Sequence, residues 1–251
     1  MAPHATYPDL AGRSVFISGG ATGIGEALVR AFAAQGARTA FVDIDTAAGE
    51  ALAAELGPGT HFAPCDITDT PAYQAAIRAA AERHGPVTAL LNNAANDVRH
   101  SLGELTPERF DALIGVNLKH ALFAAQTVAP MMRGAGGGAI VNFGSISWMV
   151  PQGNFPAYAS SKAAIHGLTR TLARDLGGDG IRVNTLVPGW VMTEKQKRLW
   201  LDEAGKAAIA ANQLLAGPLL PGHIAAMALF LASDASAMCT AQNFLVDGGW
   251  I

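Results

Sequence analysis

Residues 14–35, SVFISGGATGIGEALVRAFAAQ, decide the fold of this chain. The first five residues are mostly apolar and predict a short strand, which leads directly into a loop containing Gly19, Gly23 and Gly25. Residues 26–35 predict a helix. Glycines between a strand and a helix let the backbone turn sharply and approach a pyrophosphate, whose charge is met by free amides at the helix start. This order of elements therefore predicts a dinucleotide site.

The second predicted strand, residues 39–42, ends at Asp43, eighteen positions after Gly25. A carboxylate there can accept hydrogen bonds from both hydroxyls of an adenosine ribose and would repel a 2′-phosphate, so it favours NAD over NADP. Thr22 in the glycine loop is uncharged and also offers nothing to a 2′-phosphate. The alternative is that Asp43 only caps the next helix, although Asp45 is better placed for that role.

Strands and helices alternate along the rest of the chain. Apolar runs predict five more strands, at residues 61–65, 87–91, 139–143, 181–187 and 242–246. This alternation predicts an α/β fold with one domain, residues 1–251, built as a Rossmann-type, doubly wound, seven-stranded parallel sheet with helices on both faces. Ligands bind such sheets at the carboxyl ends of the strands. The candidate residues at those ends are Gly19, Asp43, Asp66, Asn93, Ser145 and Pro188.

Three segments need separate interpretation. Residues 1–12 predict a loose polar lead-in. Residues 107–129 predict one long helix that contains Asn117, and a buried asparagine in a helix either bonds a bent backbone or organises water. Residues 190–213 mix charged residues, tryptophan and alanine, and we interpret this segment as a mobile substrate lid with a short helix.

The composition argues against several classes of function. The chain has 251 residues and no stretch of about 18 uncharged apolar residues. The first ten residues lack a basic, apolar signal pattern, so we expect a cytoplasmic protein without membrane contact. A net charge of -3 with scattered basic residues gives no footprint for nucleic acid. Cys65 and Cys239 are isolated, which predicts buried free thiols and no metal site.

The segment after the fifth strand carries the candidate catalytic residues. Ser145 begins a loop at the strand end, and a helical pattern after Pro156 contains Tyr158 and Lys162. Tyr158 and Lys162 are four positions apart, so they share one face of the helix. A nearby ammonium favours the phenolate and lowers the pKa of a tyrosine, which can then take a proton from an alcohol held by Ser145. The alternative is a core tyrosine beside a surface lysine, which the strand-end serine and the glycine loop disfavour.

Two more motifs complete the pattern. Asn92-Asn-Ala-Ala95 follows the fourth strand and Pro188-Gly189 follows the sixth. With them, the chain resembles the short-chain dehydrogenase/reductase family over essentially its whole length. Two departures are minor, because Ser18-Gly19 stands where the family usually has Thr-Gly and Ala95 where it often has Gly. The resemblance rests on the loop from Gly19 to Gly25, Asp66, Asn92 to Ala95, Asn117, Ser145, Tyr158, Lys162 and Pro188-Gly189.

The resemblance implies a role for each catalytic residue. Tyr158 would be the general base, Lys162 would lower its pKa and bind the nicotinamide ribose, and Ser145 would position the reacting oxygen. Asn117 would hold a water of a proton relay through its helix backbone. The family usually forms tetramers through paired helices, so a homotetramer is implied. The predicted NAD contacts are Gly19, Thr22, Gly23, Ile24, Gly25, Asp43, Asp66, Ile67, Asn93, Ala94, Ala95, Tyr158, Lys162, Pro188, Gly189, Val191 and Thr193.

A narrower resemblance is to bacterial aldose 1-dehydrogenases, which oxidise the anomeric hydroxyl of a pyranose to a lactone. It rests on residues 92–100 (NNAANDVRH), 142–148 (NFGSISW), 188–193 (PGWVMT) with Gln196, and 246–250 (VDGGW). A sugar site needs directional polar groups and an aromatic or apolar face, and these loops supply both. The predicted sugar contacts are Asn96, His100, Ser145, Ser147, Trp148, Asn154, Tyr158, Trp190 and Gln196, with Gln152 a further candidate.

The sequence thus predicts NAD-linked oxidation of a small sugar, and two alternatives stay open. Within the same fold, the chain could be an NAD(P)-dependent enzyme of another small alcohol or ketone, such as a β-ketoacyl thioester. A nucleotide-binding protein without chemistry is disfavoured, because Ser145, Tyr158 and Lys162 are all present. Whether the sugar is neutral or anionic also stays open. Four basic residues could serve an anionic substrate, although solvated lid charges are the favoured interpretation: Arg99, Lys195, Lys197 and Arg198.

Overall fold

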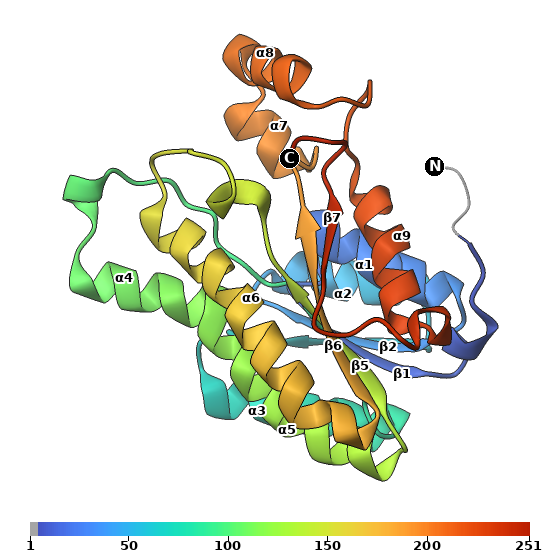
Figure 1. Ribbon diagram of the computed structural model, residues 1–251. Helices are drawn as coiled ribbons and strands as arrows, with labels where there is room; N and C mark the ends of the chain where they lie inside the picture. The colour runs from blue at the N-terminus through green and yellow to red at the C-terminus, as the bar shows by residue number, and fades with distance from the viewer. Residues whose placement is uncertain (1–4) are drawn as a thin grey trace.

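Seven parallel strands form one sheet in the order β3-β2-β1-β4-β5-β6-β7 (Figure 1). The structure is a computed structural model, which describes residues 5–251. The predicted α/β fold is confirmed, and each predicted strand agrees with an observed one to within two residues. The strands are β1 (Ser14–Ser18), β2 (Arg38–Asp43), β3 (Thr60–Pro64), β4 (Ala89–Asn92), β5 (Gly138–Phe143), β6 (Ile181–Pro188) and β7 (Asn243–Val246).

Helices cover both faces of the sheet (Figure 1). One face packs against α1 (Gly23–Ala34), α2 (Thr46–Leu56) and α9 (Pro221–Ala232). The other face packs against three helices from the middle of the chain, α3 (Thr70–His84), α5 (His120–Gly134) and α6 (Pro156–Leu176). Because both faces are covered, every residue of β1 and β4 is buried, as is usual for the central strands of a parallel sheet.

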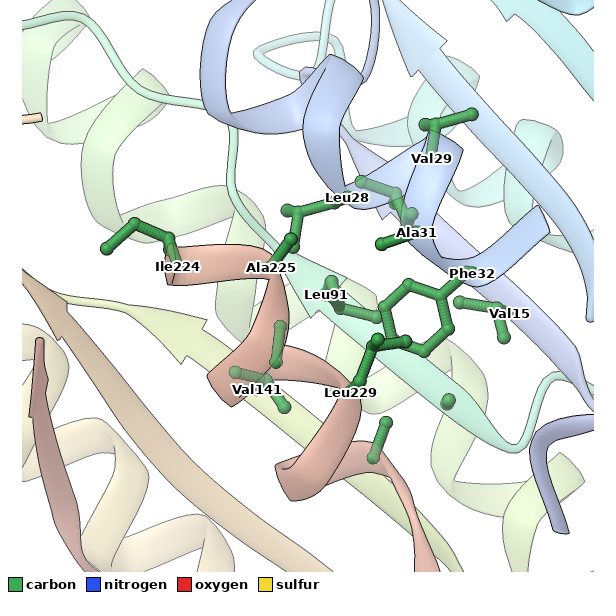
Figure 2. Close-up of a cluster of buried hydrophobic side chains, with 14 of the residues drawn as sticks. Val15, Leu28, Val29, Ala31, Phe32, Leu91, Val141, Ile224, Ala225 and Leu229 are labelled. Carbon is green, nitrogen blue, oxygen red and sulfur yellow. The ribbon is translucent and has the colours of Figure 1, made fainter. Parts of the chain in front are cut away.

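Alternate residues of each central strand belong to different cores. Val15 and Leu91 pack with Phe32 of α1 and Leu229 of α9, as Figure 2 shows. Phe16, which follows Val15 in β1, points into the opposite core. Each large apolar side chain buried in this way stabilises the fold by about 1.5–3 kcal/mol. The helices α1 and α9 thus share one core on this face of the sheet, and Gly23 and Gly25 lie in the first turn of α1.

Three details differ from the sequence predictions. The lead-in is not loose throughout, because Pro8–Leu10 forms a 3-10 helix and Leu10 is fully buried in the core; residues 1–4 lie outside the described part of the chain. The predicted helix at 107–129 is α4 (Pro107–Ile114), a π-helical turn (Gly115–Lys119) and α5. The 190–213 segment holds two helices, α7 (Glu194–Trp200) and α8 (Glu203–Asn212).

Some features bear on the classes of function considered above. No helix within residues 5–251 has both the length and the apolar character needed to cross a bilayer. In the same residues, His, Cys, Asp and Glu side chains do not gather in groups of three that could bind a metal ion. Both cysteines are free thiols, as predicted, although they are half-buried where the sequence predicted buried thiols.

Candidate active site

The carboxyl edge of the sheet holds a cavity of about 1070 Å³. The ends of β1, β2, β4, β5 and β6 contribute to its wall, together with the first residues of the 190–213 segment. Every residue predicted to contact NAD lines this cavity, and so do the three residues Ser145, Tyr158 and Lys162. The structure therefore places the predicted dinucleotide residues and three of the four predicted catalytic residues in one continuous space, whereas Asn117 does not line it.

The glycine loop between β1 and α1 closes tightly on itself. A Cβ atom on Gly25 would lie 1.7 Å from the carbonyl oxygen of Gly19, so only glycine fits at position 25. Gly19 has φ +67, in the left-handed region that favours glycine. The side-chain amide of Asn93, after β4, donates to the carbonyl oxygen of Gly19 at 2.8 Å and to that of Ser18 at 3.1 Å. Asn93 thus fixes the loop from the neighbouring strand.

Asp43 is oriented by the backbone around it. Its Oδ2 accepts a hydrogen bond of 2.9 Å from the amide of Ala21 in the glycine loop, and its Oδ1 accepts one of 3.1 Å from the amide of Asp45. The cap of α2 is Asp45, whose Oδ1 accepts from the amide of Ala48 at 3.1 Å. The capping alternative for Asp43 is therefore wrong, and its carboxylate remains available in the cavity wall.

Asp66 lies after β3 and also lines the cavity. One carboxylate oxygen, Oδ1, accepts hydrogen bonds from the amide and the hydroxyl of Thr68, at 2.9 and 2.7 Å. Its other oxygen, Oδ2, makes no hydrogen bond with residues 5–251 and can accept one from a ligand.

The side chains of Ser145 and Lys162 both lie near the end of β5. Lys162 is almost fully buried, and its Nζ donates a hydrogen bond of 2.8 Å to the carbonyl oxygen of Phe143. The same Nζ lies 5.6 Å from the centre of the Tyr158 ring. Ser145 begins the 3-10 turn Ile146–Trp148, and its Oγ accepts a hydrogen bond of 3.1 Å from the amide of Ser147. Strand, turn and helix thus bring the hydroxyl, the phenol and the ammonium together.

The electrostatics of Tyr158 differ from the sequence prediction. Burial raises the pKa of Tyr158, the negative charge of Asp97 raises it further, and a hydrogen bond with Ser145 lowers it. Burial lowers the pKa of Lys162 to about 8, against the opposing charge of Asp97. The sequence predicts that Lys162 lowers the pKa of Tyr158, whereas in the structure that pKa is raised, with burial as the largest cause and Asp97 as the second. A positive charge brought into the cavity would favour the phenolate.

Asn117 lies in the π-helical turn and is fully buried. Its Oδ1 accepts from the amide of Asn96 at 2.9 Å, and its Nδ2 donates to the carbonyl oxygen of Asn96 at 3.0 Å. Both ends of the side chain are thus occupied by the loop that follows β4. Any contact with a relay water would come from the backbone, where a π-turn disturbs the regular helical hydrogen bonds.

The predicted sugar contacts divide into two groups. Those in the cavity wall are Asn96, Ser145, Ser147, Gln152, Tyr158, Trp190 and Gln196. His100, Trp148 and Asn154 do not line the cavity, so their contact with a sugar stays a prediction. Hydrogen bonds with other parts of the chain hold these residues in their positions. The His100 amide donates to the Asn154 carbonyl oxygen at 2.7 Å, and the Trp148 indole donates to His166 Nε2 at 3.0 Å.

Sequence reasoning missed several aromatic and acidic residues of the cavity wall, among them Asp97, Phe155 and Trp250. Asp97 accepts hydrogen bonds from the side chains of Lys195 and Gln196. Asp97 lies within the 92–100 motif, so its polar neighbours were a usable signal. Trp250 lies 6.1 Å from Trp190, ring centre to ring centre. Trp250 ends the 246–250 motif, but the motif alone does not show that the chain after β7 brings this residue to the cavity.

These observations fit a dinucleotide. The glycine loop presents the first amides of α1, whose helix dipole favours a pyrophosphate, and Asp43 offers a carboxylate where the second strand ends. Ser145, Tyr158 and Lys162 lie farther along the same cavity, where a reacting alcohol or carbonyl would be held. A dinucleotide cavity with these three groups defines a nicotinamide-dependent oxidoreductase.

The comparisons with known proteins agree. The family model described as enoyl-(acyl carrier protein) reductase matches residues 19–251. A probable galactose dehydrogenase of Rhizobium meliloti is 46% identical over 251 residues, covering 98% of each chain. A D-xylose 1-dehydrogenase of Caulobacter vibrioides is 45% identical over 250 residues, again covering 98% of each chain. A solved short-chain dehydrogenase/reductase mutant of Serratia marcescens matches with a TM-score of 0.90 and 31% identity, covering 96% of this chain and 99% of that one.

The chain belongs to the short-chain dehydrogenase/reductase family. It is therefore an oxidoreductase of a small molecule with NAD or NADP as its cofactor.

Proposed function

We propose that this protein oxidises the anomeric hydroxyl of an aldose to a lactone, with NAD as the hydride acceptor. The observation that carries the proposal is the shared cavity wall of Ser145, Tyr158 and Lys162 beside a sugar-sized set of polar and aromatic groups, including Asn96 and Trp190. Two relatives at 45–46% identity over nearly the full length are named for the oxidation of galactose and D-xylose.

In the proposed mechanism, Ser145 and Tyr158 hold the anomeric hydroxyl. Tyr158 Oη accepts the hydroxyl proton while the hydride leaves the anomeric carbon, so the carbon is oxidised and the C–O bond becomes a carbonyl. NAD, when bound, supplies the hydride acceptor. Lys162, fixed to the carbonyl of Phe143, contributes positive charge beside the phenol. That charge stabilises the phenolate against the raised pKa that burial gives Tyr158.

The preference for NAD over NADP rests on Asp43. Its carboxylate is held by two backbone amides in the cavity wall and can accept hydrogen bonds from the ribose hydroxyls. A 2′-phosphate would meet a negative charge there.

Four organisational features belong to the same proposal. We infer one domain over the whole chain, with residues 190–213 acting as a lid, because Gln196 and Lys195 contact Asp97 across the cavity. Exposed apolar residues on and beside the edge strand β7, including Met238 and Leu245, support a homotetramer. Free thiols at both cysteines support a cytoplasmic location.

The test is a matrix of cofactors and substrates with purified protein. Galactose, xylose and arabinose, an open-chain polyol and a β-ketoacyl thioester are each incubated with NAD or NADP (or the reduced forms), and nicotinamide absorbance is followed. We expect NADH formation with an aldose, and a lactone that hydrolyses to the aldonic acid. Turnover of the thioester alone would identify the reductase alternative. No turnover with any substrate, despite measurable NAD binding, would favour a non-catalytic nucleotide-binding protein.

A further inference from the structure

Arg99 has an unusual environment for a charged side chain. It is half-buried, follows β4 in the loop that carries Asn96 and Asp97, and lines the active-site cavity. Within residues 5–251 its guanidinium makes no hydrogen bond and no ion pair. Burying a guanidinium without a carboxylate or carbonyl partner is unfavourable, so this placement needs an explanation.

The environments of the other arginines differ from that of Arg99. Five of them bond carboxylates, carbonyl oxygens or hydroxyls: Arg13, Arg30, Arg38, Arg133 and Arg182. Those without such a partner in the described chain are mostly exposed to solvent: Arg78, Arg83, Arg170, Arg174 and Arg198. Arg109 is half-buried but lies outside the cavity. Of the arginines within residues 5–251, only Arg99 is half-buried, lines the cavity and has N–H groups without an acceptor.

Two aromatic rings hold the Arg99 guanidinium. Its Cζ lies 4.0 Å from the centre of the Trp200 ring, at the end of α7, and 5.6 Å from the centre of the Phe155 ring, just before α6. Contacts with ring faces fix the position of a guanidinium without using its N–H donors, which lie in its own plane. Arg99 is therefore positioned in advance, with its hydrogen-bonding edge unused.

The position is close to the reacting groups. The Phe155 ring lies 5.9 Å from the Tyr158 ring, so a single aromatic side chain separates Arg99 from the proposed base. The two lysines of the 190–213 segment that line the cavity already have carboxylate partners. Lys195 pairs with Asp97, and Lys197 pairs with Glu194. Arg99 thus supplies a positive charge at the substrate end that no carboxylate of the described chain neutralises.

We propose that Arg99 binds an anionic group on the substrate, so that the preferred aldose carries a negative charge on a carbon away from the anomeric centre. A carboxylate at carbon 6, as in a hexuronic acid, matches the two parallel donors of a guanidinium, and a sulfate or phosphate ester at that carbon shares the same chemistry. This inference rests on the proposed aldose oxidation and names the substrate class of the same site. It makes Arg99 a specificity-determining residue.

The competing explanation is that Arg99 only fastens α7 to the loop after β4 through the Trp200 contact. The two explanations predict different kinetics. A purely structural role affects every sugar by the same factor, whereas charge recognition affects only the anionic ones.

The experiment compares galactose, galacturonate, galactose 6-sulfate and galactose 6-phosphate, which differ only at carbon 6. Saturating NAD is used with the wild type and with Arg99→Met, Arg99→Lys and Arg198→Met. Arg198 is the matched control, because it is an exposed arginine of α7 outside the cavity. Thermal unfolding and NAD affinity are measured for each variant, so that a general loss of structure is recognised.

We expect the wild type to prefer at least one anionic sugar over galactose in kcat/KM. Arg99→Met should lower kcat/KM for that sugar about 10- to 100-fold, mainly through KM, because hydrogen bonds to charged groups contribute roughly 1.5–3 kcal/mol. Galactose turnover should change little, Arg99→Lys should be intermediate, and Arg198→Met should keep the wild-type ratio. The favoured anionic sugar identifies the group as carboxylate, sulfate or phosphate.

Several results would overturn the inference. Equal loss for all four sugars in Arg99→Met would assign the residue a structural role only. Equal use of galactose and the anionic sugars by the wild type, or preference for galactose, would refute the inference and leave aldose oxidation standing. Absence of turnover with every aldose, neutral or anionic, would refute the proposed function together with it.

Discussion

Gln196 Nε2 donates a hydrogen bond of 2.7 Å to Asp97 Oδ2, which joins α7 to the loop after β4. The same glutamine accepts a hydrogen bond of 3.1 Å from the indole of Trp190, so three residues form a chain across the substrate end of the cavity. The negative charge of Asp97 also raises the pKa of both Tyr158 and Lys162. One side chain therefore links the position of the lid to the protonation of the proposed base.

This link predicts a change in pH dependence. Asp97→Asn removes the negative charge that raises the pKa of Tyr158, so that pKa should fall. Because the base must be deprotonated to act, the acid limb of the kcat/KM profile should move to lower pH. The measurement is a pH profile of aldose oxidation. Asp202→Asn removes a carboxylate that caps α8 in the same segment and should leave the limb in place. A shift of the limb to higher pH would contradict the assignment.

Tyr158→Phe should reduce kcat by about 10²–10⁴-fold or more, because the variant lacks the group that takes the proton. NAD affinity should stay near that of the wild type, which isothermal titration can check. The matched control is Tyr73→Phe, since Tyr73 is fully buried in the core and should not affect turnover. Substantial activity in Tyr158→Phe would remove this tyrosine from the mechanism.

Asp43→Ser should shift the cofactor preference towards NADP. Removal of the carboxylate takes away both the ribose contacts and the repulsion of a 2′-phosphate, so the NADP/NAD ratio of kcat/KM should rise about tenfold or more. Asp66→Asn alters a different carboxylate of the same cavity and should leave the ratio close to that of the wild type. A wild-type enzyme that already prefers NADP would show that the interpretation of Asp43 is incorrect.

Gly25→Ala should abolish dinucleotide binding. The added methyl group would lie 1.7 Å from the carbonyl oxygen of Gly19, so the loop must open or the first turn of α1 must move. Gly134→Ala is the control, because a methyl group there would meet no other part of the described chain within 4 Å, and helix propensity makes alanine neutral or slightly favourable. Fluorescence titration with NADH and thermal unfolding distinguish a binding defect from unfolding. Normal NADH affinity in Gly25→Ala would refute the close-approach argument.

Most of the fold followed from local patterns. The strand at Ser14–Ser18 and the glycine loop after it were predictable because buried parallel strands are short apolar runs and because glycine marks the turn. The π-helical turn at Gly115–Lys119 was not, since its hydrogen-bond shift depends on the loop that Asn117 holds. Leu10 looked like part of a polar lead-in because a single apolar residue has no periodicity to reveal its burial.

The residues of the candidate site also fall into those that the sequence could place and those that it could not. Residues next to a strand end, such as Asp43 and Ser145, could be placed in the cavity from the sequence, because the carboxyl ends of parallel strands meet at one edge. Loop residues could be placed only in part, because their direction depends on contacts with distant segments: Asn96 and Trp190 line the cavity, whereas Trp148 does not. Trp148 turns to His166 on α6, and the raised pKa of Tyr158 depends on burial and on Asp97, neither of which the local motif reveals.

The backbone of the loop after β4 is fastened to distant segments at two points. Asn96 is held by the Asn117 side chain, and the His100 amide is held by the Asn154 carbonyl. Between these anchors lie residues 97–99, of which Asp97 and Arg99 line the cavity, and none of the three belongs to the glycine loop. Directed evolution confined to this tripeptide would explore new sugar selectivity while the scaffold and the cofactor half of the enzyme are preserved.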